Sequence, residues 1–226
     1  MKRALFRFSQ LLVQLYFRLL FRIEVRGLEL VPAQGRLLFA ANHISGYDPP
    51  LLGCLIPRVL YFMAKQELFE HPLLAALLRF YHCVPIDRAE PGRASVRQIE
   101  RLLQRDEAVL LFPEGTRTKS GRMGAIKAGI GMIAARNHAS IQPIFLHGLF
   151  RVRGSFLKRP RVQVIFGKVV AIEPFLQNGL TGKELYLAIA AVAQESIQNL
   201  ATGEDRIRKR PDELETHAEK LPANSV

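Results

Sequence analysis

Two short polar segments, each directly after an apolar stretch, contain the residues of this chain best suited to chemistry. Segment 42–48 (NHISGYD) follows the apolar residues 37–41, and segment 112–117 (FPEGTR) follows residues 108–111. Ligand sites in open α/β sheets gather where strands end. The first segment offers a titratable base with a carboxylate, and the second offers groups that bind phosphate. Together they predict a base that acts on a hydroxyl of a phosphorylated substrate.

His43 is the candidate general base. Imidazole titrates near neutral pH, so it can take a proton from a hydroxyl that becomes a nucleophile. Asp48 lies five residues further on and can accept a hydrogen bond from the other ring nitrogen, which would support the charged imidazole. In an alternative interpretation, Asp48 only caps a helix that begins at Pro49. The isolated spacing H-x-x-x-x-D by itself favours that alternative.

Residues 114–117 (EGTR) form the candidate phosphate site. Arg117 can hold a phosphate through two hydrogen bonds, Thr116 can donate its hydroxyl, and Gly115 lets backbone N–H groups approach an anion. Glu114 can accept a hydrogen bond from a substrate hydroxyl or hold Arg117 in place. An ordinary ion pair between Glu114 and Arg117 in a loop is equally compatible with the sequence.

Two further segments extend the site with weaker signals. In segment 84–88 (VPIDR), Arg88 is a candidate second phosphate ligand oriented by Asp87, although a surface salt bridge is the commoner meaning of such a pair. Segment 142–145 (QPIF) is an apolar strand start that contains Pro143. It could line a channel for an acyl chain, but its composition favours packing in the core.

The overall composition restricts the class of protein. A chain of 226 residues fits one large α/β domain. The formal net charge of +12 predicts an anionic partner. Two cysteines without metal or redox spacing indicate a reducing compartment and no disulfide framework. The positive charge is concentrated near the N-terminus and in residues 151–161, where Phe and Leu are interleaved, which suits a lipid surface better than a nucleic-acid duplex.

Residues 4–23 have the pattern of an amphipathic helix. Six polar residues at spacings of three and four lie on one side of it: Arg3, Arg7, Gln10, Gln14, Arg18 and Arg22. Arg18 interrupts the apolar run, so a helix that lies in the membrane interface is favoured over one that spans the bilayer or packs in the core. A cleavable signal peptide is not expected, because no small-residue cleavage site follows. We therefore predict an interfacial helix over residues 1–24.

The remainder alternates strand-like and helix-like segments, which predicts a mainly parallel sheet with helices on both faces over residues 25–202. The residues from 203 to 226 are polar and are expected to form a mobile tail. The expected strands are 36–41, 59–64, 83–86, 108–112, 141–146 and 162–166. The expected helices are 50–55, 66–81, 95–105, 126–136 and 183–200.

The order of the four segments, N-H-x-x-x-x-D, I-D-R, F-P-E-G-T-R and Q-P-I, resembles the four motif blocks of the glycerolipid acyltransferase family. The likeness is to the bacterial type of 1-acyl-glycerol-3-phosphate acyltransferase, and it covers about residues 25–170. It implies a glycerol-3-phosphate acyltransferase-like α/β fold with an N-terminal membrane-binding element. Lys127 and Gly129 also fit a K-x-G that often follows the third block. Gln142 departs from the pattern, because the family usually has an aliphatic residue there.

The resemblance also implies a role for each candidate residue. His43 would be the general base and Asp48 its partner, while Pro143 would belong to the acyl or acceptor pocket. The residues expected to bind the phosphate and glycerol of the acceptor are Arg88, Glu114, Gly115, Thr116 and Arg117. No cofactor or metal ion is expected, and acyl-CoA or acyl carrier protein would be the co-substrate.

The predicted function is transfer of a fatty acyl group from such a thioester to the free hydroxyl of 1-acyl-glycerol-3-phosphate, at the cytoplasmic face of the cell membrane. Membrane lipids would be contacted through residues 3–22, with residues 149–161 as a second contact. Another lysolipid acceptor is an alternative, as is a non-enzymatic basic protein that binds membranes or RNA. No aromatic RNA-binding signature supports nucleic acid as a partner. A lipase or esterase is disfavoured because no G-x-S-x-G occurs in the chain.

Overall fold

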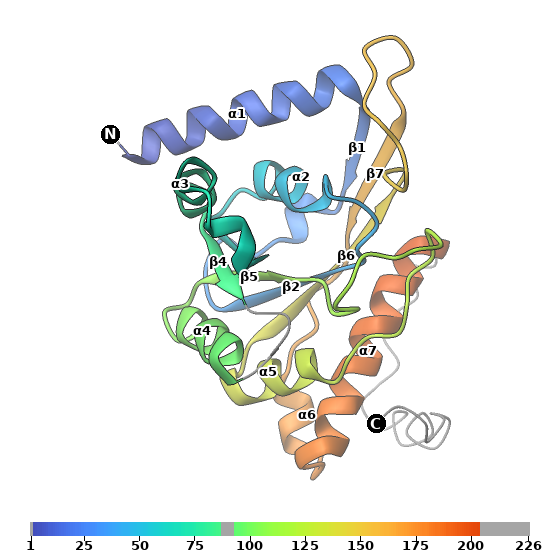
Figure 1. Cartoon of the computed structure of the whole chain (residues 1–226). Helices are drawn as coiled ribbons and strands as arrows, with labels where there is room; N and C mark the ends of the chain where they lie inside the picture. The colour runs from blue at the N-terminus through green and yellow to red at the C-terminus, as the bar shows by residue number, and fades with distance from the viewer. Residues whose placement is uncertain (1, 87–92, 204–226) are drawn as a thin grey trace.

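Seven strands form one sheet at the centre of the structure, a computed structural model that describes residues 2–86 and 93–203 (Figure 1). Their order across the sheet is β1-β7-β6-β2-β5-β3-β4. Strands β2 to β6 run parallel to one another, whereas β7 is antiparallel to β6 and β1 is parallel to β7. The strands are β1 (Arg22–Arg26), β2 (Leu37–Ala41), β3 (Leu60–Lys65), β4 (Cys83–Ile86), β5 (Ala108–Leu111), β6 (Ser140–His147) and β7 (Arg161–Phe166).

Helices cover both faces of this sheet, which confirms the predicted fold class (Figure 1). Helices α1 and α2 pack on one face, and α4, α5, α6 and α7 pack on the other. The helices are α1 (Lys2–Leu20), α2 (Asp48–Leu55), α3 (Pro72–Phe80), α4 (Arg93–Leu103), α5 (Gly129–Asn137), α6 (Glu173–Gln177) and α7 (Gly182–Thr202). Short 3₁₀ helices occur at Leu28–Leu30 and Gln66–Phe69.

Strand β2 lies in the middle of the sheet, and all five of its residues are buried. Leu37 and Phe39 belong to the core cluster beneath α1 and α2, whereas Leu38 and Ala40 belong to the cluster beneath α5 and α7. A strand that is covered on both faces must be apolar at every position. This explains the uninterrupted run LLFAA, and it places the polar residues after Ala41 at the rim of the sheet.

The N-terminal helix is shorter than predicted. It ends at Leu20, and residues 22–26 form β1, which pairs in parallel with β7. The helix predicted over residues 1–24 is therefore wrong in its last residues, and Arg22 belongs to the sheet. The signal for a strand was present, because Ile23 and Val25 alternate with charged residues at period two.

Two other helices begin later than predicted. The helix predicted over 66–81 begins at Pro72, whose missing N–H is tolerated in the first turn, and a 3₁₀ helix precedes it. The helix predicted from residue 126 begins at Gly129, and the short helix α6 was not predicted. The predictions made for residues 87–92 and 204–226 concern parts of the chain outside the described residues.

Helix α1 turns part of its polar stripe toward the protein. The side-chain amides of Gln10 and Gln14 donate to the carbonyl oxygens of Gly53 and Cys54, the Gln10 bond being 2.8 Å. Carbonyl oxygens in the last turn of a helix such as α2 have no hydrogen-bond donor within the helix, so the two amides supply donors to them. The opposite side of α1 is apolar and exposed: Leu5, Phe8, Leu11, Leu12, Leu15, Tyr16 and Leu19. In the described part of the chain, no helix combines the length and hydropathy needed to cross a bilayer.

Candidate active site

His43 and Asp48 meet where β2 ends and α2 begins. His43 Nδ1 lies 2.8 Å from Asp48 Oδ2, and the same oxygen accepts the backbone N–H groups of Ile44 and Ser45 at 2.7 and 2.8 Å. Asp48 is fully buried, and its Oδ1 has no hydrogen-bond partner among the described residues. A carboxylate held by three donors on one oxygen has a fixed orientation. It therefore favours the tautomer of His43 with the proton on Nδ1, which leaves Nε2 as the basic nitrogen.

Two neighbours position the His43 ring and backbone. The ring stacks on Phe112, with ring centroids 3.9 Å apart and an angle of 17° between the planes. The side chain of Asn42 continues the β2–β6 pairing beyond the strand, since its Nδ2 donates to Leu146 O at 2.9 Å and its Oδ1 accepts from Leu146 N at 2.7 Å. Asn42 is buried, so both of its hydrogen bonds are shielded from water. These contacts hold the end of β2 firmly and fix the plane of the imidazole.

Glu114 joins the two loops that carry the candidate site. Its Oε1 accepts the backbone N–H of His43 at 2.8 Å, and its Oε2 accepts the backbone N–H of Gly124 at 2.7 Å. The described residues contain no ion pair between Glu114 and Arg117, so the interpretation in which Glu114 holds Arg117 is wrong. The carboxylate has a structural role instead, and its part in acceptor binding stays a prediction.

The predicted phosphate-binding residues lie at the exposed rim beside His43. Thr118 donates its backbone N–H to His43 O at 2.8 Å, which fixes the preceding Gly115, Thr116 and Arg117 next to the histidine loop. Gly115, Thr116 and Arg117 are all exposed. A β-carbon added at Gly46 would lie 3.7 Å from Arg117 Nη1, so the guanidinium lies close above that turn.

Gly115 shows why a glycine is needed in this loop. Its φ of +80° is unfavourable for residues with a side chain. An added β-carbon would also lie only 3.0 Å from Lys127 Nζ. The absence of a side chain thus lets the Lys127 ammonium come close to the backbone of the loop. Arg117 and Lys127 together give the rim a positive charge.

Comparisons with known proteins identify the family of the chain. The profile of the protein family described as Acyltransferase matches residues 22–147, more than half of the chain. The chain belongs to this acyltransferase family.

Named relatives of this acyltransferase come from bacteria and plants. It is 28% identical to a 1-acyl-sn-glycerol-3-phosphate acyltransferase of Bacillus subtilis. The alignment spans 186 residues, which are 82% of this chain and 91% of the relative. A protein of the same name from Pseudomonas aeruginosa is 29% identical over 67% of this chain and 60% of its own length. The relative from Limnanthes alba is 32% identical over 61% of this chain, which spans about half of that longer protein.

A solved structure shares the fold of this acyltransferase. The crystal structure of the 1-acyl-sn-glycerophosphate acyltransferase PlsC from Thermotoga maritima superposes with a TM-score of 0.72. The superposition covers 92% of this chain and 83% of that protein, at 21% sequence identity. At this identity the likeness supports the fold.

The predicted roles of two site residues of the acyltransferase are not tested by the structure. Arg88 and its neighbour Asp87 lie outside the described residues, so the phosphate-binding role of Arg88 stays a prediction. Pro143 is buried within β6, where its carbonyl oxygen accepts the backbone N–H of Gly167 at 2.9 Å. A β-carbon added at Gly167 would contact Pro143 Cγ and Leu200 of α7. Pro143 thus packs on the α7 side of the sheet, and its assignment to an acyl or acceptor pocket also stays a prediction.

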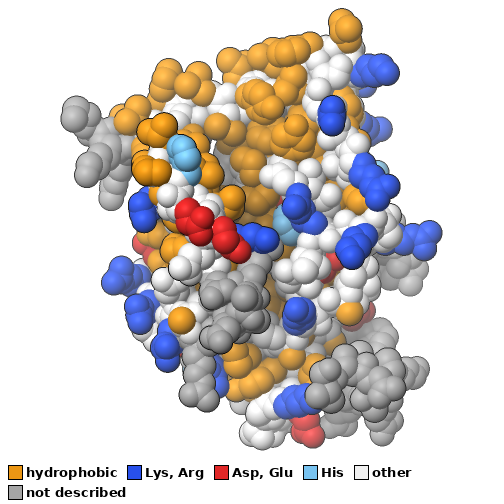
Figure 2. All heavy atoms as spheres, in the orientation of Figure 1, with side chains coloured by type: hydrophobic (Ala, Val, Ile, Leu, Met, Phe, Trp, Pro, Cys, Tyr) orange, Lys and Arg blue, Asp and Glu red, His pale blue; other side chains and the backbone are white. Residues whose placement is uncertain are grey.

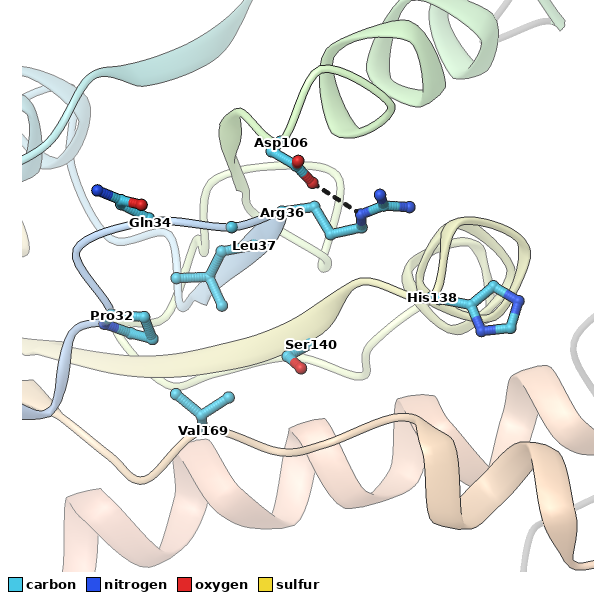
Figure 3. Close-up of a pocket in the computed structure, with 9 residues that line it drawn as sticks. Pro32, Gln34, Arg36, Leu37, Asp106, His138, Ser140 and Val169 are labelled. Atoms are coloured by element: carbon cyan, nitrogen blue, oxygen red, sulfur yellow. Dashed lines mark hydrogen bonds and ion pairs between the residues drawn. The ribbon is translucent and has the colours of Figure 1, made fainter.

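A hollow of about 350 Å³ opens at the opposite end of the sheet (Figure 3). Leu37 and Ser140, the first residues of β2 and β6, line it together with Arg36 and Asp106. Arg36 and Asp106 form an exposed ion pair there. Because His43 follows the other end of β2, this hollow is not part of the candidate active site. Within residues 2–86 and 93–203, no group of three or more His, Cys, Asp or Glu side chains is placed to hold a metal ion.

Sequence reasoning assigned no role to Asn42 or Phe112, although both belong to the quoted segments. An asparagine directly after a buried strand is a usable signal, because a buried amide must find hydrogen-bond partners. The stacking of Phe112 on His43 could not be read from the sequence. It depends on β2 and β5 being neighbours in the sheet.

Proposed function

We propose that this acyltransferase moves a fatty acyl group from an acyl thioester to the free hydroxyl of 1-acyl-glycerol-3-phosphate, which gives phosphatidic acid for phospholipid biosynthesis. The observation that carries the proposal is the contact between His43 Nδ1 and the buried carboxylate of Asp48 at 2.8 Å, beside a cationic rim. The names of the relatives from Bacillus subtilis and Pseudomonas aeruginosa support the choice of acceptor. Another lysolipid with a phosphate is the alternative acceptor.

In this proposal His43 acts as a general base. Its Nε2 removes the proton from the acceptor hydroxyl as the oxygen attacks the thioester carbonyl, and Asp48 stabilises the resulting imidazolium. The carbon–sulfur bond then breaks, and the proton on His43 passes to the departing sulfur. The products are an ester and a free thiol, so neither a covalent acyl-enzyme nor a redox step is needed.

The acceptor phosphate is assigned to the rim formed by Gly115, Thr116 and Arg117, with Arg88 as a further ligand on the basis of the resemblance. A guanidinium can bind two phosphate oxygens at once and so fix the direction of the attached glycerol. The rim is joined to His43 through the hydrogen bond from Thr118 N. Binding the phosphate there would therefore bring the free hydroxyl toward Nε2, which lowers the entropic cost of the reaction.

The same proposal places the protein at the cytoplasmic face of the cell membrane. Hydrophobic side chains gather at one end of the molecule (Figure 2). The exposed ones include the outer side of α1, Leu73 and Leu77 of α3, and Phe156 and Leu157 of the β6–β7 loop, the last two being 68% and 97% exposed. This loop is attached to the end of α1, because Ser155 N donates to Leu20 O at 3.1 Å. An apolar face flanked by cations is typical of proteins that bind membrane surfaces.

The activity is tested by mass spectrometry of the products formed from a panel of lysolipids and acyl thioesters. We expect phosphatidic acid from lysophosphatidate. We also expect His43→Ala to lower the rate by a factor of about 10²–10⁴, the usual contribution of a general base. The control is His138→Asn, since His138 is exposed at the end of α5. If His43→Ala kept activity within tenfold of the native protein, the role given to His43 would be wrong.

Membrane binding is tested by flotation with vesicles of phosphatidylethanolamine and phosphatidylglycerol. The double variant Leu11→Ser/Leu15→Ser should bind at least tenfold more weakly, because each buried leucine contributes about 1.5–3 kcal/mol. The matched control is Leu30→Ser/Val59→Ser, which changes two apolar side chains that are each 39% exposed and belong to segments other than α1. Equal loss of binding in both double variants would contradict the assignment of α1 to the membrane.

A further inference from the structure

Two cationic segments that are far apart in the sequence meet beside the active site. Gly121, with a φ of +81°, lies against the ring of Phe150, and a β-carbon added there would be 2.8 Å from Phe150 Cδ1. On the other segment, Arg151 Cζ lies 5.1 Å from the centroid of the same ring. The Phe150 ring therefore joins the turn at 118–122 to Arg151, within a cation–π contact.

The turn at 118–122 is held by its own side chains. Thr118 Oγ1 donates to Arg122 O at 2.6 Å and accepts the backbone N–H of Ser120 at 3.3 Å. Ser120 Oγ accepts the backbone N–H of Arg122 at 3.3 Å. Because Thr118 N also donates to His43 O, the turn is fixed relative to the base. Its two cationic side chains, Lys119 and Arg122, are exposed.

Lys119, Arg122 and Arg151 are here called the cationic cluster, and they are not neutralised by any carboxylate of the described residues. Among the ion pairs formed by the described residues, none includes a member of the cluster. The carboxylate of Glu114, which lies on the same loop, is occupied by two backbone N–H groups. Lys and Arg side chains are prominent on this face of the molecule, adjoining the apolar area (Figure 2). Unpaired cations at the edge of a site attract an anionic ligand.

We propose that the cationic cluster binds the phosphate groups of coenzyme A when acyl-CoA is the donor. This inference rests on the proposed function, because that reaction needs a thioester. A donor with its carbonyl at His43 carries its nucleotide phosphates at the far end of the pantetheine arm, away from the acceptor phosphate. The cluster lies further along the loop than Thr116 and Arg117, beyond the bond from Thr118 N to His43 O, and it extends through Phe150 to Arg151 of a second loop. Phosphates bound there need not compete with the acceptor phosphate. A turn with two exposed cations, joined through one aromatic ring to a third cation, suits a compact group of phosphates better than the extended surface of a carrier protein.

The test measures binding of coenzyme A itself by isothermal titration calorimetry, together with steady-state kinetics. The variant is Lys119→Gln/Arg122→Gln/Arg151→Asn, where asparagine is chosen because the φ of residue 151 is +52°. The control is Lys168→Gln/Lys183→Gln, which removes two exposed cations that follow β7 and begin α7. We expect the cluster variant to weaken coenzyme A binding at least tenfold and to raise the KM for acyl-CoA by a similar factor. The control should change neither quantity by more than twofold.

Two further measurements test whether the cluster binds the acceptor or the membrane instead. The KM for lysophosphatidate and the affinity for phosphatidylglycerol vesicles should change by less than twofold in the cluster variant. An equal rise in the KM for lysophosphatidate, or an equal loss of vesicle binding, would overturn the inference in favour of the acceptor or the membrane. If the native protein used acyl carrier protein but did not bind coenzyme A, the inference would also fail while the proposed function stood. Cluster-dependent binding of coenzyme A without acyl transfer to lysophosphatidate would support the inference and contradict the proposed acceptor.

Discussion

The two ends of strand β2 each carry a pair formed by a nitrogen base and a carboxylate, with nearly the same contact distance. His43 Nδ1 and Asp48 Oδ2 are 2.8 Å apart after the strand, and Arg36 Nε and Asp106 Oδ1 are 3.0 Å apart before it. The side chains of the first pair are 12% and 0% exposed, whereas those of the second are 38% and 62% exposed. The two pairs are therefore alike in contact distance but differ in burial.

The difference lies in what surrounds each carboxylate. Asp48 receives two backbone N–H groups besides the imidazole, and its position is fixed by the start of α2. Exposed ion pairs such as Arg36–Asp106 contribute little to stability, because water screens them. A buried carboxylate is costly to desolvate, and its partners must offset that cost. The comparison teaches that burial and the number of donors distinguish a candidate site from a surface ion pair.

The largest expected effect comes from replacing each carboxylate by its amide. Asp48→Asn should lower kcat by a factor of about 10²–10⁴, because an amide can no longer stabilise the imidazolium and also changes the tautomer of His43. Asp106→Asn should leave kcat within twofold of the native value. Steady-state kinetics with lysophosphatidate and acyl-CoA measure both. Similar kcat values for the two variants would contradict the claim that only the pair after β2 acts in catalysis.

The same two variants should also differ in stability. Asp48→Asn should lower the free energy of unfolding by about 1.5–3 kcal/mol, since charge-assisted hydrogen bonds to Oδ2 are weakened. Asp106→Asn should cost less than about 1 kcal/mol. Asp106 has a φ of +58°, a conformation that asparagine tolerates, so backbone strain should not contribute to the change in the free energy of unfolding. Urea denaturation followed by circular dichroism gives both values, and a larger loss for Asp106→Asn would contradict this account.

Glu114 extends the comparison to a carboxylate that acts on the backbone. Glu114→Gln should lower kcat about tenfold, because the amide nitrogen must face one of two N–H groups and His43 loses part of its support. The KM for lysophosphatidate should change by less than threefold, as expected for a positioning residue. A matched control is Glu107→Gln, at the opposite end of the sheet just before β5. A large rise in KM with unchanged kcat would instead assign Glu114 to acceptor binding.

The His43–Asp48 pair was predictable from the sequence because its contact is local. The two residues are five positions apart, and Gly46 lies between them in the turn that brings their side chains together. The role of Glu114 was not predictable, because its partners are backbone N–H groups 71 and 10 residues away. Almost every residue has a backbone N–H, so the residue types do not show which one will be the partner. The contact of Gly121 with Phe150 depends on how two loops pack, which local patterns do not encode.

The alternation of apolar strands was likewise enough to predict the central sheet, since buried parallel strands are apolar throughout. Strand β1 was missed because Arg22 continues the spacing of the polar stripe in the preceding helix, so two periodic patterns overlap there. The other residues of the stripe do lie in the helix, as predicted. That Gln10 and Gln14 would bind the end of α2 required knowing where α2 lies.

The smallest expected effect tests a histidine at the same end of the sheet as Arg36 and Asp106. His82 precedes β4 and lies against the rings of Phe6 and Tyr61, and burial lowers its pKa below the ordinary value of 6.5 despite the opposing charge of Glu107. The unfolded chain therefore binds a proton first as the pH falls. His82 lowers the free energy of unfolding progressively below about pH 6.5 and leaves it unchanged above that pH.

His82→Asn should accordingly lessen the loss of stability between pH 7 and pH 5, measured by urea denaturation at each pH. Asparagine is suitable because His82 has a φ of +58°. The matched control is His138→Asn, at a φ of +49° on an exposed histidine, which should keep the pH dependence of the native protein. Because Phe6 belongs to α1, protonation of His82 would weaken a contact that holds the N-terminal helix. A steeper pH dependence in His82→Asn would reverse the sign of this argument and place the charged form of His82 in the folded state.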